Sequence, residues 1–113
     1  MTGHHGSLGE FEHLVLLALA RRGDDAFGVD ICDELRATAG RDASVPAVYV
    51  TLTRLERKGL VQSHQEGGET ERGSRARKRF RLLKAGVDAL EHSRGELDRM
   101  WAGVHFRPQQ GRS

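Results

Sequence analysis

The sequence has little of what secreted, membrane and metal-cluster proteins depend on. It contains a single cysteine, Cys32, which excludes an intrachain disulfide and a cysteine-based metal cluster and favours a reducing cytoplasm. No apolar run approaches the roughly 20 residues of a membrane-spanning helix, and the first residues lack the apolar core of a signal peptide. We therefore expect a cytoplasmic protein without a membrane partner.

Patterns typical of enzymes and cofactor sites are also missing. We find no internal repeat, no glycine-rich phosphate loop, no Ser/His/Asp grouping and no carboxylates that a fold would obviously pair. His4 and His5 lack a further ligand at metal-binding spacing, and the acidic residues 30, 33 and 34 are the polar positions of an amphipathic helix. The sequence predicts no enzyme, no metal site and no cofactor.

Net charge is low but unevenly distributed. Residues 1–40 hold three Lys/Arg against seven acidic residues, residues 41–86 hold eleven against five, and residues 87–113 hold four of each. The basic charge is therefore confined to the middle third of a chain of 113 residues, a length that suits one small domain. This distribution is typical of a polyanion-binding surface on a neutral or acidic scaffold.

The middle third opens with a well-delimited helix. Val48, Leu52 and Leu55 recur at i, i+4 and i+7 and predict one buried face. Ser44 suits the N-cap, and Gly59 can end the helix in a left-handed conformation. Together these signals predict a short helix with one face in the core.

The opposite side of this helix is small, hydroxylic and cationic, as a helix that reads the major groove requires. We assign guanine or phosphate contacts to Arg54 and Arg57, a thymine methyl contact to Val50, and base or phosphate contacts to Thr51 and Thr53. Tyr49 would give its hydroxyl to a phosphate. For this segment alone, an ordinary surface helix is an alternative of equal weight.

Two helices precede this candidate recognition helix. Residues 8–22 form a helix that is apolar nearly all round, which predicts contact both with the rest of the fold and with a second subunit. Residues 26–39 form an amphipathic helix that ends at Gly40, and a short turn leads into the recognition helix. This arrangement predicts a helix-turn-helix.

A basic β-hairpin is expected next. Residues 60–65 resemble a strand, and a second strand places Arg77, Arg79 and Arg81 outward with Phe80 and Leu82 inward. A solvated edge strand is the alternative, but the density of cations favours nucleic acid. The residues expected to supply salt-dependent phosphate contacts are Lys58, Arg72, Arg75, Arg77, Lys78 and Arg79.

The last helix, residues 84–104, carries a loose heptad seam that no later element can cover, so a second copy is its expected partner. The predicted homodimer interface comprises Phe11, Leu14, Leu90, Leu97, Met100, Trp101 and Val104. The predicted organisation is a disordered tail (1–7), a winged helix-turn-helix domain (8–83), a dimerisation helix (84–104) and a polar tail (105–113). The fold class is mainly α with a small β-hairpin.

These motifs, in this order and spacing, resemble the PadR-like family of bacterial transcriptional regulators over about residues 9 to 101. The family's Tyr-Gly-x-x-Ile motif is similar to residues 27–31, with Phe27 for Tyr, and the most specific similarity lies in residues 48–61. Residues 72–75 and 79–82 resemble its wing. The family's Leu-Thr-Pro-x-Gly before the last helix is here Leu82-Leu83-Lys84-Ala85-Gly86, without the Thr cap and the Pro.

The resemblance implies a homodimeric winged helix-turn-helix repressor that binds double-stranded operator DNA. It also implies that a small aromatic effector releases DNA in some members. Two alternatives remain at this stage: a winged-helix module that binds protein, and an aromatic-ligand-binding protein whose dimer cleft is lined by Met100 and Trp101.

Overall fold

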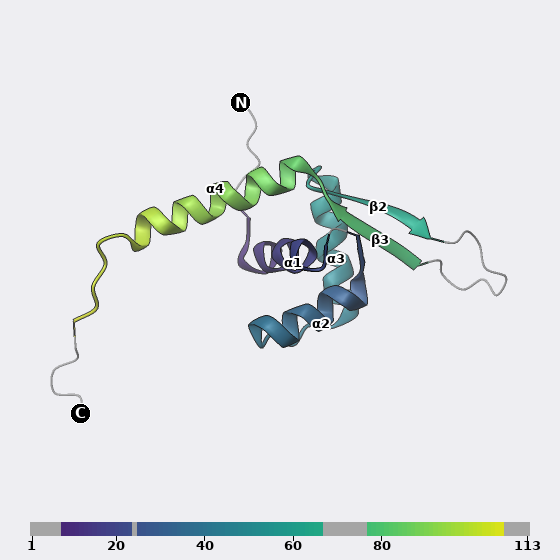
Figure 1. The fold of residues 1–113 in the computed structure, drawn as a ribbon, viewed down its shortest axis with the longest axis horizontal. Helices are drawn as coiled ribbons and strands as arrows, with labels where there is room; N and C mark the ends of the chain where they lie inside the picture. The colour runs from purple at the N-terminus through teal and green to yellow at the C-terminus, as the bar shows by residue number, and fades with distance from the viewer. Residues whose placement is uncertain (1–7, 24, 67–76, 108–113) are drawn as a thin grey trace.

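The computed structural model of the protein describes residues 8–23, 25–66 and 77–107. Its elements run in the order α1, β1, α2, α3, β2, β3, α4 (Figure 1). Their bounds are α1 Glu10–Arg21, β1 Ala26–Phe27, α2 Gly28–Ala39, α3 Val45–Arg57, β2 Val61–Glu66, β3 Arg77–Leu82 and α4 Lys84–Trp101. A mainly helical fold with a small sheet confirms the predicted fold class. Within the described ranges, none of the helices combines the length and apolarity that crossing a membrane requires.

The core lies where α1, α2 and α3 meet and the sheet closes over them. The periodic apolar residues predicted for the inner face of α3, Val48, Leu52 and Leu55, are all fully buried. They pack with residues of α1, α2 and the sheet, chiefly Val15, Leu16, Leu19, Ile31, Leu35, Leu60, Val61 and Phe80. Burial of these side chains is the main driving force that holds the three helices together.

The sheet differs from the predicted hairpin because it has a third strand. Residues Ala26 and Phe27, predicted as the start of a helix, pair antiparallel with Phe80 and Arg79, which gives the strand order β1-β3-β2. Helix α2 therefore begins at Gly28, and the Asp30 carboxylate caps it by accepting the Phe27 N–H at 2.9 Å. A two-residue strand carries no periodic signal, so only its distant partner strand defines it.

The ends of α3 follow the predicted signals. The Ser44 hydroxyl accepts a hydrogen bond from the Ala47 N–H at 3.1 Å, and Pro46 occupies the first turn, where an N–H is not needed. Gly59 has a φ of 80°, the left-handed conformation that lets the chain turn into β2. The limits of α3 are thus set by local sequence.

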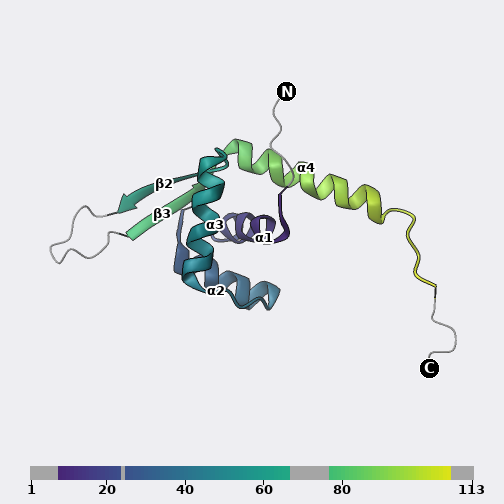
Figure 2. The ribbon, with the colours of Figure 1, turned by 180° about the vertical axis from the view of Figure 1, so that it is seen from behind.

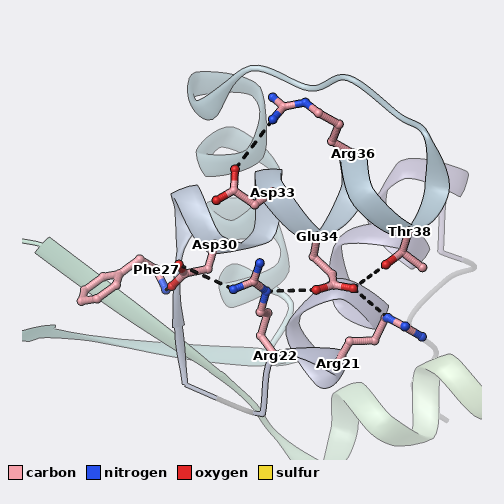
Figure 3. Close-up of polar contacts among 8 residues, drawn as sticks. All are labelled: Arg21, Arg22, Phe27, Asp30, Asp33, Glu34, Arg36 and Thr38. Carbon is pink, nitrogen blue, oxygen red and sulfur yellow. Dashed lines mark hydrogen bonds and ion pairs between the residues drawn. The ribbon is translucent and has the colours of Figure 1, made fainter.

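A polar cluster joins α1 to α2 (Figure 3). The Glu34 carboxylate accepts hydrogen bonds from Arg21 Nε at 2.9 Å, from Arg22 Nε at 3.0 Å and from the Thr38 hydroxyl. Hydrogen bonds from Thr38 and the two arginines lower the pKa of Glu34 from its ordinary 4.5 to about 2. Asp30 lies 3.9 Å from Arg22, so these acidic side chains are occupied by cations of the same domain.

Helix α4 packs on the domain only through its first half. Gly86, Leu90 and Ser93 are buried, and the Leu83 N–H donates to the Leu60 carbonyl at 3.0 Å. A Cβ on Gly86 would lie 2.4 Å from that same carbonyl oxygen, so only glycine permits this approach. Beyond Ser93 the helix projects away from the domain, and both views show it leaving in a direction opposite to the β2–β3 hairpin (Figures 1 and 2).

Candidate nucleic-acid interface

The outward face of α3 is the polar, cationic surface expected from the sequence. Val50 is 58% exposed, and Thr53, Arg54 and Arg57 are also exposed. With Tyr49, these four residues line a shallow hollow of about 280 Å³. Two long cations, a hydroxyl and an apolar side chain thus project from one helix face. These groups can form hydrogen bonds and apolar contacts with base edges.

Thr51 does not belong to this surface. Its side chain is only 4% exposed and faces the core with Val48, Leu52 and Leu55, so the predicted contact between Thr51 and DNA is wrong. Residue 51 lies at the boundary between the apolar and polar faces of α3, and packing within the domain places its side chain on the inner side. On the outward face of α3, the exposed threonine is Thr53.

Tyr49 is held in one orientation by its neighbours. Its ring lies edge-on to Phe80 with centroids 5.8 Å apart. A Cβ on Gly28 would come within 2.7 Å of the same ring, so the absence of a side chain at Gly28 makes room for Tyr49. Sequence reasoning noted the Phe27-Gly28 pair as a family motif but missed this packing role. The half-buried Tyr49 is fixed at the edge of the hollow.

Glu56 fixes α3 against the wing. Its carboxylate accepts hydrogen bonds from the Ser63 N–H at 3.2 Å and from the Ser63 hydroxyl at 2.9 Å. This contact joins the last turn of α3 to β2. This contact holds α3 and the β2–β3 hairpin in one relative orientation, an arrangement that simultaneous contacts with a groove and its flanking phosphates would require.

A buried carboxylate from α1 lies beside the cations at the end of α3. Both oxygens of Glu12 accept hydrogen bonds from Lys58 Nζ at 3.1 Å, and Arg54 Nη1 lies 3.9 Å from Oε2. Burial acts to raise the pKa of Glu12. The Gly9 N–H at 3.0 Å and the charges of Lys58 and Arg54 outweigh it and hold the pKa below its ordinary value. No local pattern in the sequence predicts a role for Glu12 at this surface, because Lys58 lies 46 residues away along the chain.

One of the predicted wing cations, Arg79, forms contacts with other residues of the same protein. The Arg79 guanidinium lies 4.4 Å above the Phe27 ring, donates to the Asp25 carbonyl at 3.2 Å and lies 3.7 Å from the Asp25 carboxylate. These contacts tie β3 to β1, whereas a free phosphate-binding side chain was predicted. Lys78 is half-buried and Arg81 is exposed. The backbone of Arg77 belongs to β3, and its side chain, like Arg72 and Arg75, lies outside the described residues.

The predicted dimer residues fall into two groups. Leu90 is only 8% exposed and belongs to the core of its own chain, so its assignment to the interface is wrong: the heptad repeat reflects packing on α1 at this point. Phe11 and Leu14 are half-buried against the same core, and Arg41 lies 5.3 Å above the Phe11 ring. The exposed predicted residues are Leu97 (54%), Met100 (76%), Trp101 (61%) and Val104 (44%).

Two apolar hollows accompany α4. Phe106, which packs edge-on to Trp101 at 6.2 Å, joins the four exposed predicted residues around a hollow of about 200 Å³. A larger groove of about 410 Å³ lies between α1 and the packed half of α4. It is lined by His13, Leu17, Ala20, Leu82, Val87, Leu90, Glu91 and Arg94. Sequence reasoning did not single out Val87 or Phe106 as exposed apolar residues.

Solved structures of similar proteins share this fold. A PadR-family transcriptional regulator from Eggerthella lenta DSM 2243 is 28% identical with a TM-score of 0.65, covering 84% of this chain and 82% of its own. A PadR-family regulator from Clostridium difficile R20291 is 26% identical with a TM-score of 0.63, covering 81% and 91%. The fold also matches F93 from STIV, a winged-helix DNA-binding protein, at 14% identity and a TM-score of 0.65, covering 82% and 92%.

Family models give the assignment. A comparison with curated proteins gave no match. The model of the Transcriptional regulator PadR-like family matches residues 15–92, which is more than half of the chain and includes α2, α3, the wing and most of the packed half of α4. The chain therefore belongs to the PadR-like family and is a winged-helix, DNA-binding transcriptional regulator.

Proposed function

We propose that the protein is a homodimeric repressor that places two α3 helices in successive major grooves of a pseudo-palindromic operator, about 34 Å apart. The observation that carries this proposal is the outer face of α3, where Val50, Thr53, Arg54 and Arg57 are exposed while the apolar face is fully buried. Arg54 and Arg57 supply the base or phosphate contacts, Val50 meets a thymine methyl group, and Tyr49 donates its hydroxyl to a phosphate.

The wing contributes affinity without sequence preference. Lys78 and the side chains of Arg72, Arg75 and Arg77 supply phosphate contacts in this proposal, and Arg79 secures the wing to β1. Residues 8–83 act as the DNA-binding unit, and α4 acts as the dimerisation helix. The uncovered apolar residues Leu97, Met100 and Trp101 support pairing with a second copy, because such side chains are costly to leave in water.

Release by a small aromatic effector is a second step of the proposal. The hollow around Trp101 and Phe106 supports it, because its lining is apolar and aromatic. Quenching of the fluorescence of Trp101, the only tryptophan, would report an aromatic ligand directly. Quenching without any DNA binding would instead favour an aromatic-ligand-binding protein that does not act on DNA.

The decisive experiment is a fluorescence-anisotropy titration against promoter-proximal DNA and a scrambled duplex at two salt concentrations. Tight binding to the first duplex alone supports a sequence-specific regulator, and a reporter gene behind that promoter then gives the sign of regulation. Equal, steeply salt-dependent binding to both duplexes would contradict operator recognition. Binding to neither would favour a winged-helix module that binds protein.

A further inference from the structure

Glu12 connects the first helix of the domain to the end of the recognition helix. Its side chain is only 10% exposed, and its two oxygens accept hydrogen bonds from Lys58 Nζ at 3.1 Å each. One of these oxygens also accepts the Gly9 N–H at 3.0 Å, which caps α1. The Glu12 carboxylate is therefore held both by the backbone at the start of α1 and by the cation that follows α3.

The Lys58 ammonium is occupied by its contacts with Glu12. Its side chain is 32% exposed, and both of its side-chain hydrogen bonds in the described structure go to Glu12. A lysine binds phosphate as a compact point charge, so an ammonium held against a buried carboxylate has little charge left for a DNA backbone. Lys58 was predicted as a phosphate contact, but in this geometry it points inward, toward α1.

Arg54 is tethered from the same side. Its Nη1 lies 3.9 Å from Glu12 Oε2, while the side chain as a whole remains 49% exposed on the reading face. This ion pair restricts the orientation of the guanidinium and leaves about half of the side chain accessible. An arginine that is oriented before binding loses less conformational freedom when it pairs with a base edge, and orientation matters most for bidentate contacts.

We propose that Glu12 is a positioning residue for sequence specificity: it holds Lys58 away from the phosphates and orients Arg54 toward the bases. This inference rests on the proposed function of α3. In this proposal, Glu12 lowers the nonspecific affinity of the surface for DNA and raises its preference for the operator sequence. A carboxylate next to a DNA-reading helix then acts as a discriminating element.

The test compares Glu12→Gln with Glu10→Gln. Gln retains the shape of the side chain and an oxygen for the Gly9 N–H, but it removes the charge that holds Lys58. Glu10 is exposed, lies in the same first turn of α1 and forms no ion pair within the described residues, so Glu10→Gln controls for net charge. Binding to the promoter-proximal duplex and to the scrambled duplex is measured at four salt concentrations.

Glu12→Gln should tighten binding to the scrambled duplex about threefold to tenfold at low salt and steepen the salt dependence by about 0.9, the value of one additional phosphate contact. Preference for the promoter duplex should fall, because Arg54 loses its tether. Glu10→Gln should change neither the slope nor the preference. If Glu12→Gln behaves as Glu10→Gln does, Glu12 only stabilises the fold and the inference is wrong.

A second variant tests whether the effect of Glu12→Gln comes from the released Lys58 charge and not from a loss of stability. Lys58→Met in the Glu12→Gln background removes the released cation and should return the slope and the scrambled-duplex affinity to those of the unmodified protein. Circular dichroism at the assay temperature confirms that each variant is folded. An unmodified protein that binds no duplex at all would contradict the proposed function together with this inference. A promoter preference that survives Glu12→Gln, with an unchanged slope, would contradict the inference alone.

Discussion

Helices α3 and α4 are both amphipathic, but their apolar residues are covered in different ways. In α3, Leu52 and Leu55 are fully buried within the chain, and the polar face is left for solvent. In α4, burial ends at Ser93, and Met100 and Trp101 are 76% and 61% exposed. The apolar face of α3 is therefore buried entirely within one chain, whereas α4 has an apolar face that the described residues do not cover.

This difference separates two kinds of recognition. A helix whose apolar side is fully packed presents a rigid polar surface, which suits hydrogen bonding to base edges. A helix with uncovered apolar side chains gains free energy by burying them, which suits association with another protein surface. In our proposal, α3 carries the DNA-reading surface and the far half of α4 carries the self-association surface.

The largest effect should come from breaking the packing of α3. Leu52→Ala should lower the free energy of unfolding by about 2–5 kcal/mol, because it opens a cavity at a fully buried position. Val50→Ala, on the 58% exposed side of the same helix, should change it by less than about 0.5 kcal/mol. Urea denaturation at one fixed protein concentration measures both. Equal losses would mean that the two faces of α3 are not distinguished by packing.

The uncovered half of α4 should matter for association and not for folding. Trp101→Ala should weaken the homodimer by at least about 2 kcal/mol, roughly thirtyfold in the dissociation constant, since buried tryptophans dominate protein interfaces. Sedimentation equilibrium measures this change, and far-ultraviolet circular dichroism should remain the same. Arg99→Ala, also exposed on α4, serves as the control. A protein that is monomeric before any substitution would refute the proposed dimer.

Substitution of two glycines tests whether the two halves of α4 differ in packing. Gly86→Ala should cost about 1–3 kcal/mol of stability, because its Cβ would lie 2.4 Å from the Leu60 carbonyl oxygen. Gly95→Ala meets only the flexible Arg99 guanidinium at 3.4 Å and should stabilise the helix by about 0.5–1 kcal/mol. Thermal unfolding gives both values. Effects of the same sign would show that α4 is not divided in this way.

The polar face of α3 is tested by Arg54→Ala. This substitution should weaken binding to the operator by about 1–3 kcal/mol and relax the preference for it, because a base contact is removed. Arg107→Ala, with the same change in charge beyond the end of α4, should leave the preference intact. Anisotropy titrations with operator and scrambled duplexes measure both. An unchanged preference in Arg54→Ala would exclude base reading by this residue.

Features set by neighbouring residues were predictable from the sequence. Ser44, Pro46 and Gly59 act within a few residues of their positions, so the limits of α3 and its buried Val48, Leu52 and Leu55 followed from local rules. Leu97, Met100 and Trp101 were also predicted as apolar residues without a partner element, and the structure leaves them exposed. Whether a second copy covers them stays a prediction.

Features set by distant residues were not predictable. Strand β1 exists because Ala26 and Phe27 pair with β3, and Glu12 meets Lys58 across a sequence separation of 46 residues. Leu90 fits a heptad repeat that suggested a dimer, but α1 covers it first. Periodicity shows which face of a helix is apolar, and only the packed fold shows which surface covers it.

The smallest expected effect concerns the contact where the packed half of α4 ends. His13 Nδ1 lies 3.1 Å from the buried Ser93 hydroxyl, and burial lowers the pKa of His13 below its ordinary 6.5. A lowered pKa means that the unfolded chain binds the proton more readily, so stability is complete above pH 6.5 and falls as the solution is acidified below it. Glu91 and Arg94, which carry opposite charges, line the same groove as His13.

His13→Asn keeps a polar atom near Nδ1 but does not titrate. The free energy of unfolding of the unmodified protein should therefore fall more steeply between pH 7.5 and 5.5 than that of His13→Asn. If His13→Asn retains the full dependence on pH, protonation of His13 does not weaken the contact, and the packed half of α4 is held by Leu90 and Gly86 without help from the imidazole.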